Sequence, residues 1–279
     1  MNAHYSGPLD PGGPVLLLGA GKMGSALLEG WLARGLDPRS VFVIDPALPD
    51  GPLEKLKARG VTVAPQPGAL SDPAAIVAAV KPQTAEAALP AAAAFAGPST
   101  VVVSVMAGAT LATLSRAFAE GTAIVRAMPN TPAAVGRGVT GVFAPETVSE
   151  RQRGVAQKLL EAAGDVVWVA EEPLIDAVTG VSGSGPAYVF LLVEEMAKAG
   201  VAAGLPADVA EILARKTVEG AGELLRRSPE TPEILRRNVT SPNGTTAAAL
   251  EVLMAGDGLG PLVERAVAAA TRRARELAG

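Results

Sequence analysis

The sequence predicts an α/β fold in two parts, a doubly wound sheet followed by an all-helical domain. Three observations predict this. Short apolar runs alternate with helical patterns over residues 15–170, these runs are continuous rather than alternating, and the strand pattern stops at the Glu-Glu-Pro of residues 171–173. Continuous apolar strands are typical of a sheet that helices cover on both faces. A chain of 279 residues is long enough for two domains with their own cores.

The first predicted strand and helix are joined by a glycine-rich turn. Residues 15–19 read as a buried strand, residues 19–24 (GAGKMG) follow at once, and a helical pattern then runs to Arg34. In a β-α-β unit the first glycine makes the turn, the second lets the backbone approach a pyrophosphate, and the third lets helix and strand pack closely. We therefore expect a Rossmann-type dinucleotide site at Gly19, Gly21, Lys22, Met23 and Gly24.

Asp45 ends the second predicted strand, at residues 41–45. It follows Gly24 by about twenty positions, where an acid that binds the cofactor ribose is expected. A carboxylate there favours NADH, because it would repel the 2′-phosphate of NADPH. The nearest bases, Lys55 and Lys57, stand on the next predicted helix. The alternative is that Asp45 only ends the strand.

The α/β alternation continues through the rest of the first part. Further strands are predicted at residues 61–63, 75–80, 100–105, 123–128, 139–143 and 166–169, and helices at residues 52–59, 84–96, 111–118 and 147–163. Ligands of doubly wound sheets bind beyond the carboxyl ends of the strands. The loops there predict further cofactor contacts, with ordinary turn chemistry as the alternative: Val80, Lys81, Pro82, Ala107, Gly108 and Asn130.

After residue 173 every periodic segment is helical. The helices are predicted at residues 174–179, 186–199, 207–227, 232–236, 246–254 and 261–277. Two of them carry apolar residues on more than one face, which a thin domain cannot bury alone, so we expect a second copy to cover them in a homodimer. The predicted domains are a mobile tail (residues 1–14), a dinucleotide-binding domain (15–170), and a substrate-binding and dimerisation domain (171–279).

A tight loop at residues 240–246 (TSPNGTT) runs into one of these apolar helices. Pro, Asn and Gly in a row favour a turn. The free N–H groups at the start of a helix, together with the positive end of its dipole, hold anions such as a carboxylate. A hydroxyl of the same turn would reach the group that carries the carboxylate. The alternative is a plain helix start with a threonine cap.

The composition excludes several kinds of chemistry. There is no cysteine and one histidine, His4, so thiolate nucleophiles, a Ser-His-Asp triad and a metal site are not expected. A net charge of −4 and 3% aromatic residues argue against nucleic-acid binding. No targeting segment or membrane-spanning apolar stretch is recognised, so we expect a soluble, cytoplasmic protein.

Five motifs, in order along the chain, resemble the pyrroline-5-carboxylate reductase family. They are residues 19–24, 80–82 (VKP), 126–132 (RAMPNTP), 180–188 (GVSGSGPAY) and 241–246 (SPNGTT), and the resemblance extends over residues 15–277. It implies that NAD(P)H gives a hydride to the C=N carbon of 1-pyrroline-5-carboxylate, which yields L-proline in the last step of proline biosynthesis. It also implies an active site shared across a homodimer, which in this family often assembles further.

The resemblance also implies roles for single residues. The Thr246 hydroxyl, the expected catalytic group, would face the ring nitrogen, while the loop around it holds the substrate carboxylate. A protonated imine is already electrophilic, so no strong general acid is needed and positioning provides most of the rate. The substrate contacts implied in this way are Ser184, Gly185, Ser241, Gly244, Thr245 and Thr246.

Two residues depart from the family pattern. Asn243 stands where the loop usually has glycine, and Asn is the other residue that best tolerates a left-handed backbone. Asp45 stands where many relatives have a small hydroxyl residue that suits NADP. This departure makes NADH use a specific hypothesis, beside NADPH.

Two alternatives remain at this point. A β-hydroxyacid dehydrogenase resembles the same two-domain plan, but its catalytic lysine would fall at Val189, and Lys198 further along reads as a solvated charge. A non-catalytic dinucleotide-binding regulator would keep residues 19–24 and lose the loop at residues 241–246. The intact loop favours an enzyme.

Overall fold

The computed structural model describes residues 8–64, 68 and 70–278, which divide into two compact units. The first unit holds the residues up to Gly183 together with Ala270–Gly279, and the second is Ser184–Ala269. We predicted the domain boundary at residue 170. The division falls later in the chain because α6 (Leu174–Val178) and the π-helical turn Thr179–Gly183 pack on the sheet.

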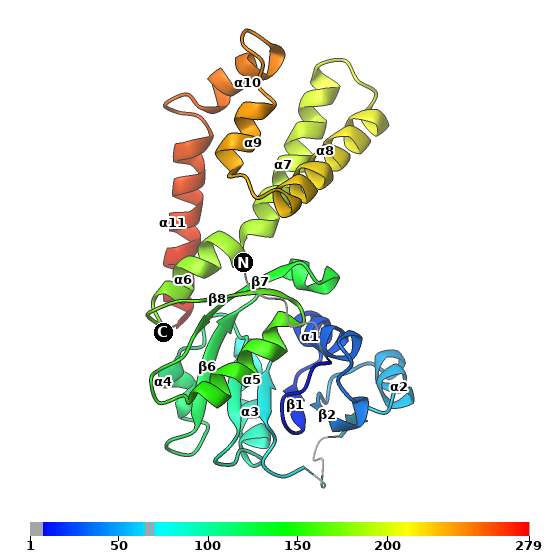
Figure 1. Ribbon diagram of the computed structural model, residues 1–279, viewed down its shortest axis with the longest axis vertical. Coiled ribbons are helices and arrows are strands. Elements are labelled where there is room, and N and C mark those ends of the chain that lie inside the picture. Colours follow the sequence, from blue (N-terminus) through cyan, green and yellow to red (C-terminus); the bar gives the residue numbers. More distant parts are fainter. Residues whose placement is uncertain (1–7, 65–67, 69, 279) are drawn as a thin grey trace. The chain divides into compact units, whose positions relative to one another are not determined.

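The first unit is built on one sheet of eight strands in the order β3-β2-β1-β4-β5-β6-β7-β8 (Figure 1). Strands β1 to β6 pair in parallel, β7 runs antiparallel to β6, and β8 runs parallel to β7. Each lies at a predicted position: β1 (Val15–Leu18), β2 (Val41–Ile44), β3 (Thr62–Val63), β4 (Ala75–Ala78), β5 (Val101–Ser104), β6 (Ala123–Met128), β7 (Gly138–Phe143) and β8 (Gly164–Trp168).

Helices cover both faces of this sheet, as the continuous apolar strands predicted. Alternate residues of each strand enter different cores: Leu17 packs with α1 and α5, whereas Leu16 and Leu18 pack with α3 and α4. The helices of this unit besides α6 are α1 (Lys22–Ala33), α2 (Asp50–Ala58), α3 (Pro82–Ala93), α4 (Leu111–Ser115), α5 (Glu150–Glu161) and the end of α11 (Leu259–Ala278), with single 3₁₀ turns at Pro38–Ser40 and Thr131–Val135.

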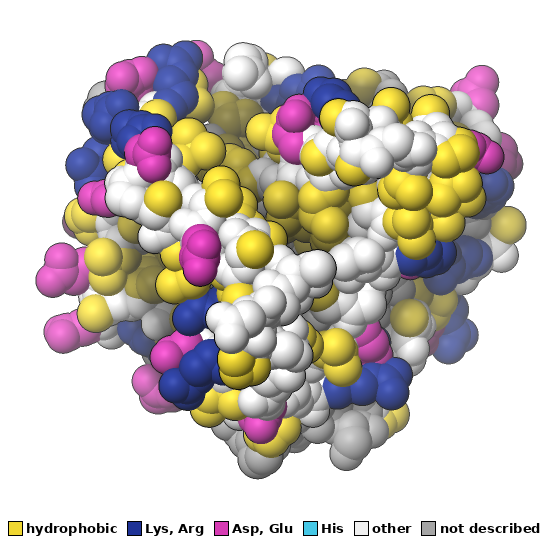
Figure 2. Space-filling view, turned by 90° about the horizontal axis from the view of Figure 1, so that it is seen from above, with side chains coloured by type: hydrophobic (Ala, Val, Ile, Leu, Met, Phe, Trp, Pro, Cys, Tyr) yellow, Lys and Arg dark blue, Asp and Glu magenta, His cyan; other side chains and the backbone are white. Residues whose placement is uncertain are grey.

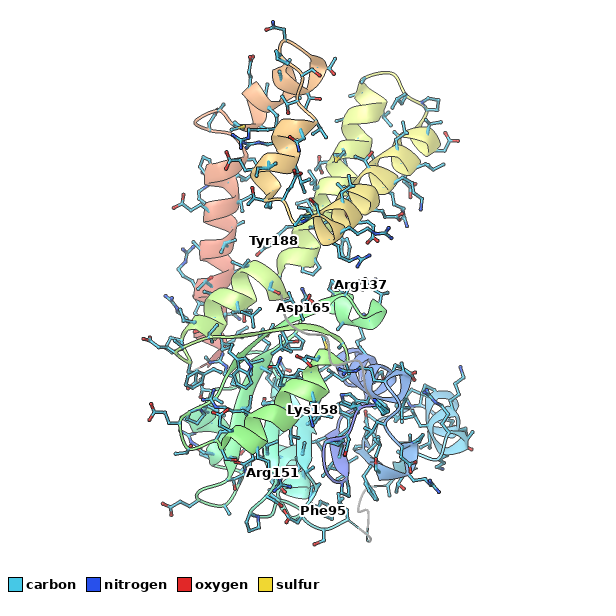
Figure 3. The ribbon with its side chains drawn as sticks, in the orientation of Figure 1. Phe95, Arg137, Arg151, Lys158, Asp165 and Tyr188 are labelled. Atoms are coloured by element: carbon cyan, nitrogen blue, oxygen red, sulfur yellow. The ribbon has the colours of Figure 1, made fainter. Side chains whose placement is uncertain are left out.

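The predicted N-terminal tail divides at residue 8. Residues 1–7, with His4, lie outside the described residues. The rest of the predicted tail instead lies against the sheet unit, where Leu9 is buried and its N–H donates to the Arg34 carbonyl at 2.8 Å. Lys158 of α5, labelled in Figure 3, donates to the Asp10 carbonyl at 3.1 Å.

The second unit is helical throughout. It contains α7 (Gly185–Ala202), α8 (Ala207–Arg227), α9 (Pro232–Asn238), α10 (Thr245–Leu253) and the first half of α11 (Leu259–Ala278). Among the described residues of α7 to α10, only Ala210 and Ala214 are buried, while large apolar side chains such as Phe190 (62% exposed) and Ile212 (60%) face outward. Figure 2 shows apolar side chains open to the surface between charged ones. A surface of this kind is typical of an interface.

None of the helices in the described part of the chain is long and apolar enough to cross a membrane.

Trp31 of α1 ties this helix to α5, and its replacement tests how the first unit is held together. The side chain is fully buried and its Nε1–H donates to the Leu159 carbonyl at 2.8 Å, in the last turn of α5, where carbonyls lack helical partners. We expect Trp31→Phe to lower the free energy of unfolding by about 2 kcal/mol. The Leu159 carbonyl would lose its hydrogen-bond donor, and the smaller side chain would leave a cavity. Chemical denaturation measures it.

Trp168→Phe is the matched control. Its Nε1–H donates to the Gln157 side chain, which can turn toward water, so we expect a loss below about 1 kcal/mol. Equal losses in the two variants would contradict the role of the Trp31–Leu159 bond.

Candidate active site

The three glycines of the turn between β1 and α1 have different structural roles. Gly19 has a φ of +89°, which L side chains rarely adopt. A Cβ on Gly24 would lie 2.0 Å from the Gly19 carbonyl oxygen, so only glycine lets α1 start this close to β1. A Cβ on Gly21 would meet no protein atom within 4 Å. The backbone at Gly21 is thus open to a ligand at the start of α1, where N–H groups and the helix dipole attract phosphate.

Asp45 faces the same turn from the end of β2. Its Oδ2 accepts from the Ala20 N–H at 2.8 Å, and its Oδ1 accepts from the Ala47 N–H at 3.0 Å. These two bonds fix the carboxylate beside the glycine-rich turn. Asp45 therefore does more than end the strand, since it ties the glycine-rich turn to the end of β2.

A cavity of about 210 Å³ opens at the carboxyl ends of β1, β2 and β4. It brings together three predicted cofactor residues that are distant in sequence: Gly19, Asp45 and Val80. Small side chains of α3 form its far wall. The full lining is Leu18, Gly19, Ile44, Asp45, Pro46, Val80, Ala87, Ala88 and Ala91. Mostly apolar walls with one carboxylate suit the flat adenine ring and its ribose.

Two of the other predicted cofactor loops have well-defined local geometry. Lys81 is the N-cap of α3; its side chain is exposed and its carbonyl accepts from the N–H and the hydroxyl of Thr84, both at 2.9 Å. Pro82 is the first residue of α3. Gly108 has a φ of +75°, and a Cβ there would lie 2.9 Å from the Leu277 carbonyl oxygen of α11. The loop of Ala107 and Gly108 thus packs against the C-terminal end of the chain.

Asn130 is engaged within the protein. Its Oδ1 accepts from the Val139 N–H at 3.0 Å, and its Nδ2 donates to the Ser182 hydroxyl at 3.2 Å. The side chain therefore ties the end of β6 to β7 and to the π-helical turn. A cofactor contact, as we predicted for it, would have to use the second N–H of the amide.

The predicted substrate loop at residues 241–246 lies in the second unit, whereas the glycine-rich turn lies in the first. Its Asn243 has a φ of +59°, so asparagine does occupy a left-handed position. The Gly244 N–H donates to the Ser241 carbonyl at 3.1 Å, which closes the turn. Gly244 is the N-cap of α10, and no described side chain caps this helix start. The structure therefore does not have the threonine-capped helix start that was the alternative. The first N–H groups of α10 lack helical partners.

The segment before α7 follows a π-helical path. A Cβ on Gly183 would lie 2.6 Å from the Met128 side chain, so this glycine allows close contact with β6. Ser184 is the N-cap of α7, and a Cβ on Gly185 would meet no protein atom within 4 Å. Tyr188 follows in the first turn of α7, as labelled in Figure 3. The backbone at Gly185 is thus as open as that at Gly21.

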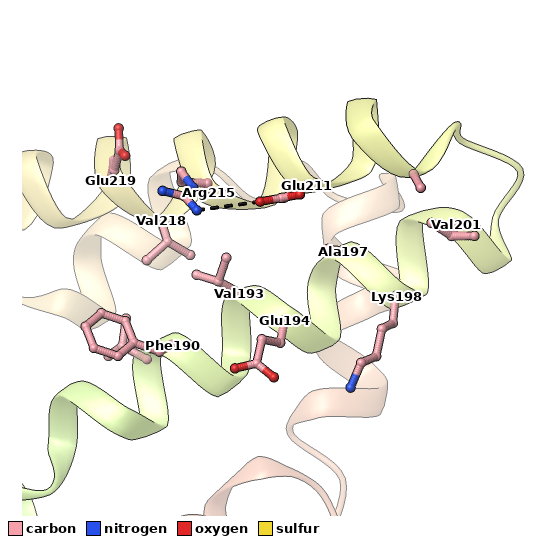
Figure 4. A pocket seen from close by; sticks show the side chains of 12 residues that line it. Phe190, Val193, Glu194, Ala197, Lys198, Val201, Glu211, Arg215, Val218 and Glu219 are labelled. Atoms are coloured by element: carbon pink, nitrogen blue, oxygen red, sulfur yellow. Dashed lines mark ion pairs between the residues drawn. The ribbon is translucent and has the colours of Figure 1, made fainter.

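A larger cavity of about 700 Å³ lies between α7 and α8 (Figure 4). Val, Ala and Phe side chains line it, with the Arg215–Glu211 ion pair at 3.6 Å among its polar residues, and it contains none of the predicted site residues. Lys198 at its edge donates to Glu195 at 2.7 Å, and this hydrogen bond holds the pKa of the Lys198 amine above its ordinary value. Lys198 is thus an exposed, paired charge, and the position where the dehydrogenase alternative needs its catalytic lysine is Val189.

Within the described ranges, there is no group of three or more His, Asp or Glu residues that could hold a metal ion.

Comparison with known proteins matches both parts of the chain. Residues 172–277 fit the family model described as pyrroline-5-carboxylate reductase dimerisation, and residues 14–108 fit the model described as NADP oxidoreductase, coenzyme F420-dependent. The pyrroline-5-carboxylate reductase of Pseudomonas aeruginosa is 39% identical over 268 residues, which covers 95% of this chain and 96% of the relative. The chain belongs to the pyrroline-5-carboxylate reductase family. This confirms the resemblance that the five motifs indicated.

Other members agree in sequence and in structure. The enzyme of the same name from a Synechocystis species is 45% identical over 204 residues, covering 72% of this chain and 74% of that protein. A solved pyrroline-5-carboxylate reductase from Coxiella burnetii superimposes with a TM-score of 0.88 at 35% identity, over 96% of this chain and 99% of the other. The Plasmodium falciparum member, solved with NADP bound, gives 0.77 at 26% identity, over 96% and 99%. These matches confirm the predicted fold class of a sheet domain followed by a helical dimerisation domain.

Sequence reasoning missed some residues that lie next to the predicted site residues. Ala87, Ala88 and Ala91 line the smaller cavity, and their helical spacing with small side chains was the available signal. Ser182 was not singled out, although it stands in the glycine-rich motif and pairs with Asn130. Arg126 was named only as part of a motif, although a charge in the middle of an apolar strand is unusual.

Gly21→Ala tests whether the open space at the turn takes a cofactor. Gly21 has ordinary extended dihedral angles (φ −67°, ψ −164°), so alanine fits the backbone. The added methyl group would stand where the pyrophosphate approaches. We expect the Kd for reduced cofactor to rise about tenfold, or about 1.4 kcal/mol, in a fluorescence titration, with an unchanged thermal midpoint.

The control is Gly24→Ala, whose methyl group meets the Gly19 carbonyl and should lower the thermal midpoint. Tight cofactor binding by Gly21→Ala would show that this space is not the pyrophosphate site.

Proposed function

We propose that this protein reduces 1-pyrroline-5-carboxylate to L-proline with a reduced nicotinamide dinucleotide. The observation that carries the proposal is the pairing of two sites in one member of this family. One is the glycine-rich turn with open backbone at Gly21, and the other is a helix start at Gly244 that no described side chain caps. The first suits a dinucleotide and the second a carboxylate.

The residues of the first unit fit the dinucleotide. The N–H groups at the start of α1 face the pyrophosphate across Gly21, and Asp45 accepts from the hydroxyls of the adenosine ribose. Lys81, Pro82, Ala107 and Gly108 contribute loops toward the nicotinamide half. When bound, the reduced nicotinamide supplies the hydride; the protein sets its direction and excludes water.

The substrate is held by the loop between α9 and α10. Ser241 and the N–H groups of Gly244, Thr245 and Thr246 bind its carboxylate, and the Thr246 hydroxyl faces the ring nitrogen. Ser184 and Gly185 line the other side of the ring. A protonated cyclic imine is already electrophilic, so these groups act by placing its C=N carbon for the hydride rather than by strong acid catalysis.

Asp45 supports a preference for NADH. Its carboxylate is fixed by two N–H groups, and no ion pair among the described residues neutralises it. Two of the three bases that follow Asp45 most closely in sequence have acid partners of their own, since Lys57 of α2 pairs with Glu54, and Arg59, just after α2, pairs with Glu29. A 2′-phosphate would therefore meet the negative charge of Asp45.

The helical unit forms a homodimer. It matches the dimerisation model of the family over residues 172–277, and its large apolar side chains face outward. We include in the proposal that such dimers assemble further, as the family often does. Light scattering in solution distinguishes a dimer from a multiple of dimers.

The reaction and its cofactor are tested together by following the absorbance of reduced nicotinamide with pyrroline-5-carboxylate. We expect turnover with a higher kcat/KM for NADH than for NADPH, and we expect Asp45→Ser to shift this ratio toward NADPH by roughly tenfold, or about 1.4 kcal/mol. No turnover with either cofactor would refute the reaction. A strong NADPH preference of the unaltered enzyme would refute only the role of Asp45.

Thr246→Ala tests the substrate loop. Loss of the hydroxyl at the ring nitrogen is expected to lower kcat/KM by about tenfold or more, or about 1.4 kcal/mol of transition-state stabilisation. Thr240→Ala is the matched control, because the Thr240 hydroxyl donates to the Arg236 carbonyl at 2.7 Å and is not a predicted substrate contact. A change below about twofold in Thr246→Ala would remove this residue from the mechanism.

A further inference from the structure

A buried ion-pair cluster joins β6 to the chain just before the glycine-rich segment of residues 179–185. Arg126 points from β6 and is only 3% exposed. Its Nη1 donates to Glu172 Oε1 at 3.2 Å, and its Nη2 donates to Asp176 Oδ1 at 3.0 Å. A charge in the middle of a buried strand is costly unless it is paired, so this cluster calls for an explanation beyond strand formation.

The two carboxylates come from the same stretch of chain. Glu172 lies just before α6, and its Oε1 also accepts from the Leu111 N–H at 2.8 Å, at the start of α4. Asp176 lies within α6 and is 7% exposed. The planar guanidinium fixes the directions of its N–H groups, so a single Arg126 side chain sets the place of α6 on the sheet.

The chain leads from α6 directly into the segment that carries the substrate contacts. The Thr179 hydroxyl donates to the Ile175 carbonyl at 2.8 Å, which continues α6 into the π-helical turn. At the far end of the turn, Ser182 is held by Asn130 and Gly183 lies against Met128. Ser184 and Gly185 follow at once. The turn is therefore held at its start through Arg126, and at its end through Met128 of β6 and Asn130 just after it.

The hydrogen bonding of Arg126 is also incomplete. Its Nε is buried and has no partner among the described residues. Buried polar atoms usually have one, and the exceptions are typical of places where function constrains the geometry. The guanidinium uses its two terminal nitrogens to bond Glu172 and Asp176. In this orientation its Nε–H has no hydrogen-bond acceptor among the described residues.

We propose that Arg126 is a positioning residue for imine reduction: by clamping Glu172 and Asp176 it sets the register of residues 179–185, and so the placing of Ser184 and Gly185 at the substrate. The role rests on the proposed function. It acts on the imine and not on the adenosine half of the dinucleotide, because the residues of the adenosine cavity lie on or next to other elements, β1, β2, β4 and α3. Loss of these ion pairs should therefore weaken binding of the imine and leave binding of the reduced cofactor unchanged.

Asp176→Asn in the full-length protein tests this. It keeps the shape of the side chain and an acceptor oxygen but removes the charge that Nη2 faces. We expect the KM for pyrroline-5-carboxylate to rise and kcat/KM to fall by about tenfold, while the Kd for reduced cofactor stays within about twofold. We also expect faster amide hydrogen exchange over residues 179–185, with slow exchange retained in β1 and β4.

Two further variants make the result decisive. Glu171→Gln removes the neighbouring exposed acid, which has no bond to Arg126, and should change neither readout. If Asp176→Asn does not fold, Glu172→Gln takes its place, because its side chain is 25% exposed and keeps an oxygen for the Leu111 N–H; the same pattern is expected at about threefold.

An unchanged KM for the imine, or equal weakening of imine and cofactor binding, would overturn the positioning role. Unchanged exchange over residues 179–185 would overturn it as well. The exchange measurement needs no turnover, so it decides the role of Arg126 even for a protein that fails to reduce the imine. Failure of the unaltered protein in the assay would instead refute the proposed function.

Discussion

The close approach of α1 to β1 is the constraint on which the nucleotide side of this protein depends. Because Gly24 has no side chain, α1 begins against the Gly19 carbonyl, with its free N–H groups at the carboxyl edge of the sheet. The same turn brings the Ala20 N–H to Asp45, which links the ends of β1 and β2. At its other end, α1 is held by the bond from Trp31 to α5. The open backbone at Gly21 follows from this packing.

The helical unit, by contrast, buries few apolar side chains by itself. Its buried residues in α7 and α8 are alanines, while leucine, isoleucine and phenylalanine side chains face outward. Exposing so many large apolar side chains to water is unfavourable unless another surface covers them. A second copy of the chain covers them in a homodimer. The two units thus differ in how they are stabilised and in what they carry. One unit has its own core and binds the dinucleotide, and the other gains its core by association and carries the loop at residues 241–246.

Much of the fold could be predicted because its signals are local. All eight strands were predicted to within a few residues, and α8 was predicted at its observed bounds, since periodicity, glycine and proline decide these elements. The antiparallel direction of β7 was not predicted, because strand direction depends on where the chain crosses the sheet. The compact units divide at Gly183, later than the predicted boundary at residue 170, whereas the dimerisation model of the family begins at residue 172. The Glu-Glu-Pro of residues 171–173 was interpreted as a boundary because the strand pattern stops there, and the sequence does not show that Glu172 is bonded to Arg126 of β6.

The sequence by itself determined the glycine-rich turn, the acid at Asp45 and the left-handed Asn243, because each depends on the conformational freedom or charge of one residue type at one position. It also determined the family, through five motifs in order. Only the tertiary structure decided that Asn130 bonds Val139 and Ser182, that alanines of α3 wall a cavity with Asp45, and that Arg126 clamps two acids of α6. These are contacts between residues far apart in the chain, and side-chain distances across a sheet arise only when the strands are assembled.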